Sequence, residues 1–281
     1  MMKPFERLSK RKHIVLFSVC SAIIISIIAF NGLSRSVYFI NIYKTFITYK
    51  LRTSHEIKTI TNRQSEPYTV DFKNGDSIPQ TIVLVIGESL NKHHMSLYGY
   101  KRDTNPLLSA MKDSLIVYRD IVSPQVHTIP VMRSILSMNE PENPDYFTKK
   151  PSLFELFNRA GFDTYLISNQ EFSEQYRSSY DILLSLAKKK LNLAPYHQHD
   201  DIVLPILDSV LSKDNGRSKL ILVHLIGNHM AYEFRYPKEY IVFDNRKDSL
   251  IPKKPYMDKN DVKTIDKYDN SVLYNDYRSE E

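Results

Sequence analysis

The stretch TIVLVIGESLNKHHMSLYGYKRDTNPLL, Thr81–Leu108, decides how this chain of 281 residues folds. Residues 82–86 are aliphatic and mostly β-branched, which predicts a buried strand of an α/β sheet. Gly87 lets the backbone turn, so Glu88 and Ser89 follow the carboxyl end of that strand, where open α/β sheets bind ligands. Ser89 is a candidate nucleophile, because free N–H groups at a helix start receive anions and a metal held by Glu88 lowers a hydroxyl pKa. The alternative is that Ser89 is only an N-cap and Glu88 a first-turn acid.

Composition narrows the class of protein. The formal charge of +6 is spread along the chain, and the sequence contains no zinc-finger, helix-turn-helix or RNA-binding motif, so nucleic acid is not a favoured partner. A positive surface facing anionic lipid explains the charge at least as well. The single cysteine, Cys20, cannot form an internal disulfide or a cysteine zinc site.

The segment 14–33, IVLFSVCSAIIISIIAFNGL, predicts a transmembrane helix. Twenty residues of helix reach about 30 Å, the thickness of the hydrocarbon core of a bilayer. The basic residues within 1–13 place the N-terminus in the cytoplasm and the rest outside it. The alternative is a cleavable signal peptide, but the apolar run is long for one and no small-x-small site follows Phe30.

Two segments separate this predicted anchor from the strand at Thr81. Residues 34–54 interleave aromatic and cationic side chains, which suits an amphipathic segment in the membrane interface; the alternative is a partly buried connector helix. Residues 55–80 are polar and contain Pro67, Gly75 and Pro79, which indicates a linker. The remaining residues, 81–281, form the predicted soluble domain.

Within that domain, strand-like and helix-like segments alternate, which predicts a sheet sandwiched by helices. Ser152 and Glu155 form a capping box that opens a helix over Leu153–Ala160, and Gly161 ends it. The strand Thr164–Ile167 follows at once. Asp201 is a candidate cap for a second helix. The run Lys188-Lys189-Lys190 predicts a solvated helix face.

The residues 219–225, KLILVHL, predict another buried strand, which ends in Gly227-Asn228-His229. Glu88 with Ser89, Asn169 and His229 each follow a strand, and parallel strands bring such residues to one rim. His197, His199, Asp200 and Asp201 form the run HQHDD; it is a possible metal cluster, although Asp before a helix is usually a cap.

Several ordered blocks resemble a known family. They are VIGES with SLYGY-x-R-x-TNP near the first strand, GFDTYLISNQ at 161–170, HLIGNHMAYEFRYP at 224–237 and YDNSVLYND at 268–276. Together they resemble the membrane phosphoethanolamine transferases that modify bacterial lipopolysaccharide, within the alkaline phosphatase/sulfatase-like superfamily; the wording is most similar to the subgroup acting on core heptose phosphate. The resemblance implies a three-layer α/β sandwich over residues 81–277.

The resemblance also implies a site and a reaction. Ser89 would be the nucleophile, and Glu88 with Ser89 would bind a catalytic Zn²⁺. Phosphatidylethanolamine would donate phosphoethanolamine through a phospho-seryl intermediate to a lipopolysaccharide core or lipid A acceptor. Substrate-binding roles fall to His127, Thr128, Asn169 and His229, each of which has an ordinary loop role as its alternative. The lip of the site would be Tyr232, Arg235 and Tyr236, with Arg235 pairing with phosphate or forming a structural ion pair.

The sequence departs from the family in two places. The zinc site of the family needs an Asp-His pair from a later S-D-H-G segment that this sequence does not contain, and relatives have several transmembrane helices before the soluble domain. We therefore expect a chain truncated at both ends and inactive alone, from an inner-membrane protein with its soluble domain in the periplasm. The alternatives are a sulfatase-like phosphodiesterase and a non-catalytic membrane-tethered remnant.

Overall fold

The computed structural model describes residues 10–30, 38–64, 69–70, 78–170, 178–193, 199–244 and 255–280. The chain divides into two compact units, Met1–Glu56 and Ile57–Glu281. The larger unit contains the sheet and all the candidate site residues that the sequence predicts. Of the HQHDD run, His197 lies outside the described residues.

The smaller unit contains helix α1, Lys10–Phe30, and the first part of helix α2, Tyr38–Gln64. Helix α1 covers the predicted anchor up to residue 30, and residues 31–33 lie outside the described part. Among the residues that the structure describes, no helix is both long enough and apolar enough to cross a membrane. The transmembrane helix over 14–33 is therefore not confirmed and stays a prediction. In α2, the exposed aromatic side chains are Tyr38, Phe39, Tyr43, Phe46 and Tyr49.

Helix α2 continues through residues 55–64, which the polar composition assigned to a linker. Ile60 is fully buried in the core of the larger unit. Arg63 forms a buried ion pair with Glu155 and donates to the carbonyl of Thr148 at 2.6 Å. A buried charge is tolerated only when it is paired in this way, so the pair holds the end of α2 on the domain. The sequence missed the helix because its partners lie about 90 residues away.

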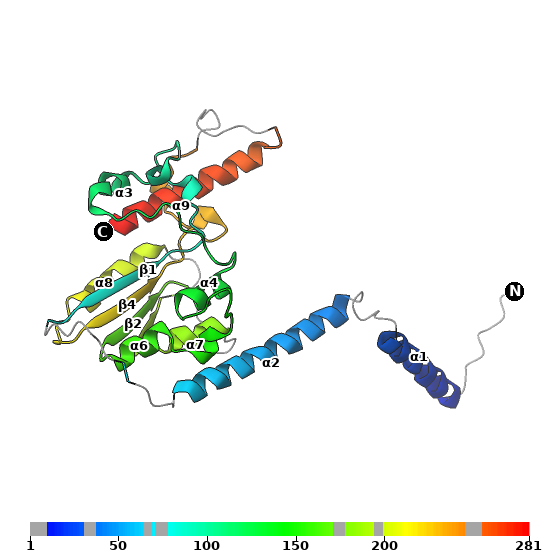
Figure 1. Cartoon of the computed structure of the whole chain (residues 1–281). Coiled ribbons are helices and arrows are strands. Elements are labelled where there is room, and N and C mark those ends of the chain that lie inside the picture. Colours follow the sequence, from blue (N-terminus) through cyan, green and yellow to red (C-terminus); the bar gives the residue numbers. More distant parts are fainter. Residues whose placement is uncertain are drawn as a thin grey trace. The chain divides into compact units, whose positions relative to one another are not determined.

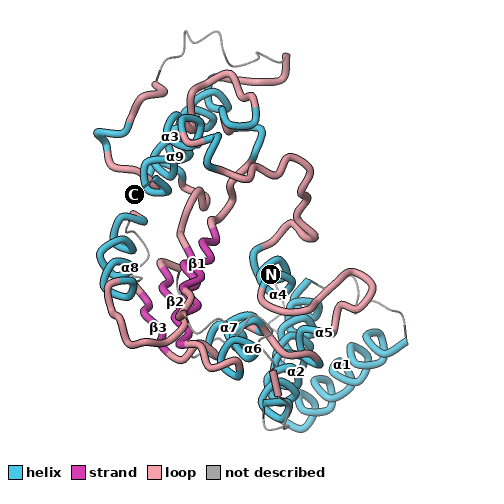
Figure 2. The backbone as a smooth tube through the Cα atoms, turned by 60° about the vertical axis from the view of Figure 1, so that its left-hand side comes forward, coloured by secondary structure: helices cyan, strands magenta, loops and turns pink. Residues whose placement is uncertain are grey.

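Four strands form one parallel sheet in the order β1-β4-β2-β3. The sequence pattern predicted three of them, β1, β2 and β4, and their parallel arrangement, but not β3; Figure 2 shows β1, β2 and β3 within this sheet. Their bounds are β1 Thr81–Ile86, β2 Asp163–Ser168, β3 Lys189–Asn192 and β4 Lys219–His224. Ile86, His224 and Ser168 lie level with one another, so the carboxyl ends of three strands share one rim. The lysines 189 and 190 lie in strand β3, so the helix face predicted for 188–190 is wrong; pairing with β2 decides their structure.

Helices cover both faces of the sheet, because strand side chains alternate between two apolar clusters. One cluster joins Leu166, Leu220 and Leu222 to helices α6 and α7, and the other joins Ile167, Ile221 and Val223 to helix α8. Figure 1 shows α6 and α7 on one side of the sheet and α8 on the other. The predicted three-layer α/β architecture is therefore confirmed. The helices of these layers are α4 Thr128–Ile135, α5 Tyr146–Lys149, α6 Leu153–Arg159, α7 Ser179–Ser185 and α8 Leu204–Leu211.

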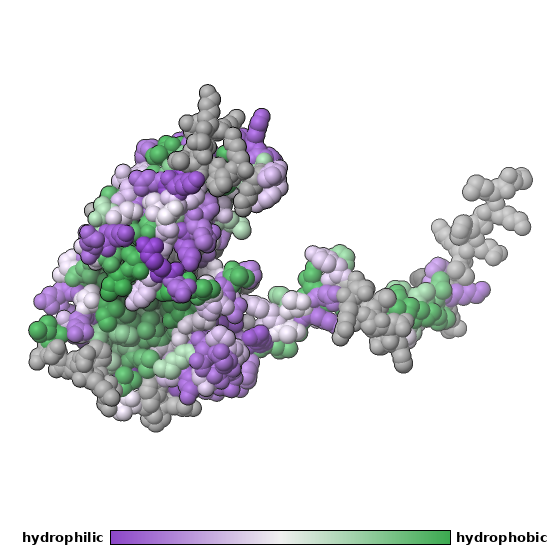
Figure 3. Space-filling model, turned by 45° about the horizontal axis from the view of Figure 1, so that its top comes forward, coloured by the Kyte–Doolittle hydropathy of each residue, from purple (hydrophilic) through white to green (hydrophobic). Residues whose placement is uncertain are grey.

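Strand β1 differs from its prediction as a buried strand. Among the strands that the structure describes, β1 pairs with β4 alone, and Val83 and Val85 are 40% and 54% exposed. The reason is its place at the edge of the sheet, which a one-dimensional pattern of apolar residues does not reveal. Figure 3 shows apolar surface gathered on this unit between polar stretches.

The capping signals in the sequence predict the start of helix α6 correctly but not the start of helix α8. The capping box of α6 is confirmed: Glu155 accepts from the N–H of Ser152 at 2.8 Å, and the Ser152 hydroxyl accepts from the N–H of Glu155 at 3.4 Å. Asp201 does not cap α8, which begins at Leu204 after the 3-10 turn η5, Asp200–Val203. The structure places this extra turn between the acidic residues and the helix, so Val203 is the N-cap.

A further layer of short elements and one long helix lies against the rim of the sheet. The long helix is α9, Lys259–Glu280, which packs against α3, Pro106–Ala110. The other short elements are η2 Lys92–His94, η3 Ser96–Tyr98, η4 Lys112–Ser114, η6 Tyr232–Phe234 and η7 Lys238–Tyr240. Most of the loops around the candidate site end in this layer.

Candidate active site

Two hydroxyl groups meet one carboxylate at the rim of the sheet. Ser89 Oγ donates to Glu88 Oε1 at 2.8 Å, and Thr128 Oγ1 donates to Glu88 Oε2 at 3.0 Å. Glu88 and Thr128 are half-buried and Ser89 is exposed. The cluster therefore contains two candidate nucleophiles that share one acid, at the strand end where the sequence predicted the site.

The two hydroxyls differ in their backbone setting. Ser89 has a positive φ of 52°, which is uncommon for a residue with a side chain. The helix predicted to start at Ser89 is absent; a turn leads instead to η2, whose N-cap is Asn91. Thr128 is the first residue of helix α4, with His127 as its N-cap. The free N–H groups expected beside Ser89 are therefore found beside Thr128.

The backbone of Glu88 lies directly against the loop that follows β4. The N–H of Asn228 donates to the carbonyl of Glu88 at 2.8 Å. Gly227 has a φ of 52°, and a Cβ placed on it would come within 2.7 Å of the Glu88 nitrogen. Only glycine fits this contact without displacing the chain. The two loops therefore approach closely because residue 227 has no side chain.

Helix α9 also contacts the Glu88–Ser89 turn, through hydrogen bonds of Tyr268. The hydroxyl of Tyr268 donates to the carbonyl of Ser89 at 2.7 Å and accepts from the N–H of Asn91 at 2.8 Å. Burial raises the pKa of this tyrosine to about 12, so it keeps its proton. Tyr268 thus fixes the backbone on either side of residue 90.

The three residues after Tyr268 hold three other segments. Asp269 accepts from Arg102 at 2.7 Å and from the hydroxyl of Tyr100 at 2.8 Å, and it pairs with His94 Nδ1 at 2.7 Å. Asn270 accepts from the N–H groups of residues 242 and 243. Ser271 accepts from the side chain of Asn228 at 2.6 Å. The YDNS block is therefore a set of anchors for the loops of the site.

His224 lies beneath the cluster and was not identified as a candidate from the sequence. Its side chain is buried, and neither ring nitrogen has a hydrogen-bond partner within the part of the chain that the structure describes. Burial lowers the pKa of His224 to about 4, while the charge of Glu88 acts in the opposite direction. The imidazole is therefore neutral at pH 7. The available signal was a polar residue that ends an otherwise apolar strand.

The other predicted site residues are Asn169, His127 and His229. Asn169 is buried and donates to Asp200 at 2.9 Å, so its amide supports the neighbouring loop. Asp200 also accepts from the N–H groups of Ile226 and Gly227, so its carboxylate anchors the loop that follows β4; burial raises the pKa of Asp200. His127 is exposed and His229 half-buried.

The predicted lip residue Arg235 is buried, in contrast to an exposed phosphate-binding arginine. It donates to the carbonyls of His229 at 3.1 Å and Met230 at 3.2 Å. Tyr236 is buried as well, and burial raises its pKa. These contacts brace the loop that follows β4, which supports a structural role for Arg235.

The chain resembles known proteins in both sequence and fold. The profile of the sulfatase family matches residues 80–278. The chain belongs to the sulfatase family. The domain accordingly has the alkaline phosphatase/sulfatase-like α/β fold, with its parallel sheet and flanking helices. This confirms the superfamily that the ordered blocks indicated.

Two relatives of this sulfatase-family chain are enzymes of one type. The chain is 31% identical over 245 residues to phosphoethanolamine transferase EptC of Escherichia coli O18:K1:H7, covering 83% of this chain and 41% of the relative. It is 32% identical over 242 residues to phosphoethanolamine transferase CptA of Salmonella typhimurium, covering 81% of this chain and 40% of the relative. The chain therefore spans about two fifths of the length of these proteins.

A solved structure with the same fold is the C-terminal periplasmic domain of Escherichia coli EptC in complex with Zn. It matches with a TM-score of 0.71 and 32% identity, over 77% of this chain and 62% of that domain. The shared sequence blocks and the shared fold agree on the same family. Because that related domain binds zinc, the residues of this chain can be compared with the ligands that zinc requires.

The described residues provide only part of a zinc site. Glu88 supplies a carboxylate, and Ser89 and Thr128 supply hydroxyls, but a closed zinc site usually has four protein ligands and a catalytic one three. No group of three or more His, Cys, Asp or Glu side chains able to hold a metal occurs in the described ranges. The donor set that these residues make does not fit the ion by itself.

Proposed function

We propose that this domain transfers phosphoethanolamine from phosphatidylethanolamine to a lipopolysaccharide core or lipid A acceptor. The observation that carries the proposal is the pair of hydroxyls bonded to Glu88 at the carboxyl rim of a sulfatase-type sheet. The names and the periplasmic placement of the relatives support the reaction and a location at the bacterial inner membrane, with this domain in the periplasm. No nucleic acid takes part.

In the first step, a hydroxyl oxygen of the enzyme forms a bond to the phosphorus of the donor. The bond from phosphorus to the diacylglycerol oxygen breaks, and the proton of the enzyme hydroxyl ends on that leaving oxygen. In the second step, an acceptor oxygen forms a bond to the phosphorus of the phosphoenzyme, the bond from phosphorus to the enzyme oxygen breaks, and that enzyme oxygen regains a proton from the acceptor. Glu88 orients both candidate hydroxyls through its two carboxylate oxygens.

The sequence places the nucleophile at Ser89, and the geometry supports a second candidate, Thr128. Thr128 makes the same type of bond to Glu88 and, unlike Ser89, lies at the start of a helix of eight residues. The N–H groups there stabilise the negative charge that develops on phosphoryl oxygens. We therefore favour Thr128 on electrostatic grounds and retain Ser89 as the alternative.

The test is mass spectrometry of lipopolysaccharide from cells that express the gene. We expect a phosphoethanolamine adduct that falls about 10³-fold or more when the nucleophile is replaced by alanine, so Ser89→Ala and Thr128→Ala distinguish the two candidates. Ser123→Ala, on an exposed loop, is the matched control and keeps full transfer. Release of free phosphoethanolamine with no modified lipopolysaccharide would contradict a transferase and indicate a phosphodiesterase. Absence of both products would support the non-catalytic alternative.

Zinc binding by Glu88 and Ser89 stays a prediction with its own measurement. Because these residues provide only part of a ligand set, we expect the purified chain to hold less than one zinc ion per molecule. Elemental analysis checks this number, with Glu88→Gln as the comparison. Tightly bound zinc at one ion per chain would contradict the partial ligand set.

A further inference from the structure

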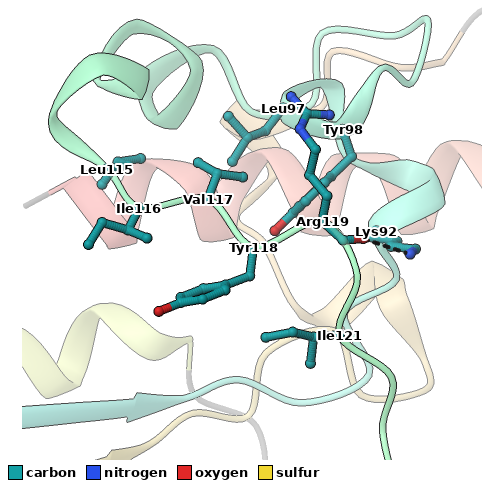
Figure 4. Close-up of a pocket in the computed structure, with 9 residues that line it drawn as sticks. All are labelled: Lys92, Leu97, Tyr98, Leu115, Ile116, Val117, Tyr118, Arg119 and Ile121. Atoms are coloured by element: carbon teal, nitrogen blue, oxygen red, sulfur yellow. Dashed lines mark hydrogen bonds between the residues drawn. The ribbon is translucent and has the colours of Figure 1, made fainter.

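A groove lies beside the candidate site, on the side of the loop that connects η4 to α4. Its volume is about 410 Å³, which is within the range of pockets that hold small ligands. We call it the 115–121 groove, after the loop that forms most of it. Figure 4 shows this loop running beside Leu97 and Tyr98, with a bond from Lys92 to the carbonyl of Arg119.

Most side chains that line the groove are apolar, and two are cationic. Its apolar walls are Leu97, Tyr98, Ile116, Val117, Tyr118 and Ile121, and its cations are Lys92 and Arg119. Ile116 is 84% exposed, Tyr118 64% and Ile121 65%. Large apolar side chains gathered and exposed in this way mark a surface that binds an apolar partner.

The groove is joined to the candidate site through one side chain. Tyr98 packs in the same cluster as Tyr268, and Tyr268 donates to the carbonyl of Ser89. Lys92 lies three positions after Ser89 in the sequence. The groove is therefore linked to the Ser89 turn by two residues of chain at Lys92 and by the packing of Tyr98 with Tyr268.

We propose that the 115–121 groove binds the acyl chains of the phospholipid donor. The inference rests on the proposed function, because a donor whose phosphodiester reacts at Ser89 or Thr128 must place its diacylglycerol part nearby. The ammonium of Lys92 and the guanidinium of Arg119 complement the phosphate charge. Tyrosines with aliphatic neighbours are the side chains that proteins present to the apolar boundary of a lipid.

The experiment is photolabelling of the full chain in phosphatidylcholine nanodiscs that contain phosphatidylethanolamine with a diazirine in its acyl chain. Trypsin releases the groove as the peptide 113–119, and mass spectrometry measures its labelled fraction. We expect Ile116→Asp and Ile121→Asp each to reduce this label about tenfold, since each removes an aliphatic contact with the acyl chain and adds a charge. The matched control is Ile241→Asp, an isoleucine that is 48% exposed and lies outside the groove; it leaves the label on 113–119 unchanged.

Two results would overturn the proposal. One is a label on 113–119 no stronger than that on peptide 239–246, which contains Ile241. The other is a label that persists in both groove variants, or that is replaced by cross-links to a second copy of the chain, which would make the groove a protein interface. Label in the groove without lipopolysaccharide modification would contradict only the proposed function, and modification without label would contradict only the groove.

Discussion

Replacing Gly227 with alanine tests how tightly the loop after β4 holds the Glu88 turn. The new Cβ would lie 2.7 Å from the nitrogen and 2.8 Å from the carbonyl oxygen of Glu88, where ordinary contacts begin at 3.4 Å. Because both neighbours are backbone atoms, no side-chain rotation relieves the overlap. The loops must separate by several tenths of an ångström.

The expected cost has two parts. Alanine in the left-handed region costs about 1–2 kcal/mol, and forcing an extra carbon into a packed site costs about 1–3 kcal/mol. Gly216 is the matched control, because it has a φ of 66° but a Cβ added to it would meet no atom within 4 Å. We therefore expect Gly216→Ala to lower the free energy of unfolding by about 1–2 kcal/mol, and Gly227→Ala by about 2–5 kcal/mol.

Urea denaturation of the two variants and the parent chain measures these differences. Hydrogen exchange at the amide of Asn228 adds a local measurement, because this N–H donates to Glu88. We expect faster exchange at Asn228 in Gly227→Ala and unchanged exchange there in Gly216→Ala. Equal destabilisation by both substitutions, with unchanged exchange at Asn228, would refute the close approach of the two loops.

Four further substitutions, one of them a control, test the packing and the charges of the domain. Arg102→Ala removes the arginine that pairs with two buried carboxylates, Asp266 and Asp269, so urea denaturation should show a loss of about 3–5 kcal/mol; Arg217→Ala, which removes a long ion pair of 3.8 Å between an exposed arginine and Asp163, should cost at most about 1 kcal/mol. Because burial lowers the pKa of His224 from 6.5 to about 4, this histidine is protonated in the unfolded chain but neutral in the folded domain between these two pH values. The contribution of His224 to the free energy of unfolding, about 3 kcal/mol, is therefore fully present above pH 6.5 and is lost as the pH falls towards 4. Unfolding measured at a series of pH values should show this fall in the free energy of unfolding, and His224→Gln should make the fall smaller. Ser152→Ala should cost about 0.5–2 kcal/mol through loss of the helix cap, and an unchanged midpoint of thermal unfolding would contradict that cap.

Local chemistry made much of the fold predictable. The capping box of α6 and the strands β2 and β4 were predicted because their signals lie within a few residues of one another. The parallel rim followed from the apolar strands and the polar residues after them. Here the pattern of residues and the packed sheet agree.

The site was predictable only in part, since its geometry depends on distant residues. The bond between Thr128 and Glu88 joins positions 40 apart, and the bond between Arg102 and Asp269 joins positions 167 apart. No pattern near Ser89 indicates that a turn, rather than a helix, follows it. The edge position of β1 likewise depends on which strands pair, and this decides the exposure of Val83 and Val85.

The hydroxyl of Tyr268 spans 179 positions to reach Ser89 and 177 to reach Asn91. Strand β1 pairs with β4 across 138 positions, so the rim and the sheet both depend on contacts between distant parts of the chain. The contacts of Tyr268, however, lie outside the strand ladder. A local opening of α9 would therefore release the Ser89 carbonyl and the Asn91 N–H while every strand pairing of the sheet stays in place.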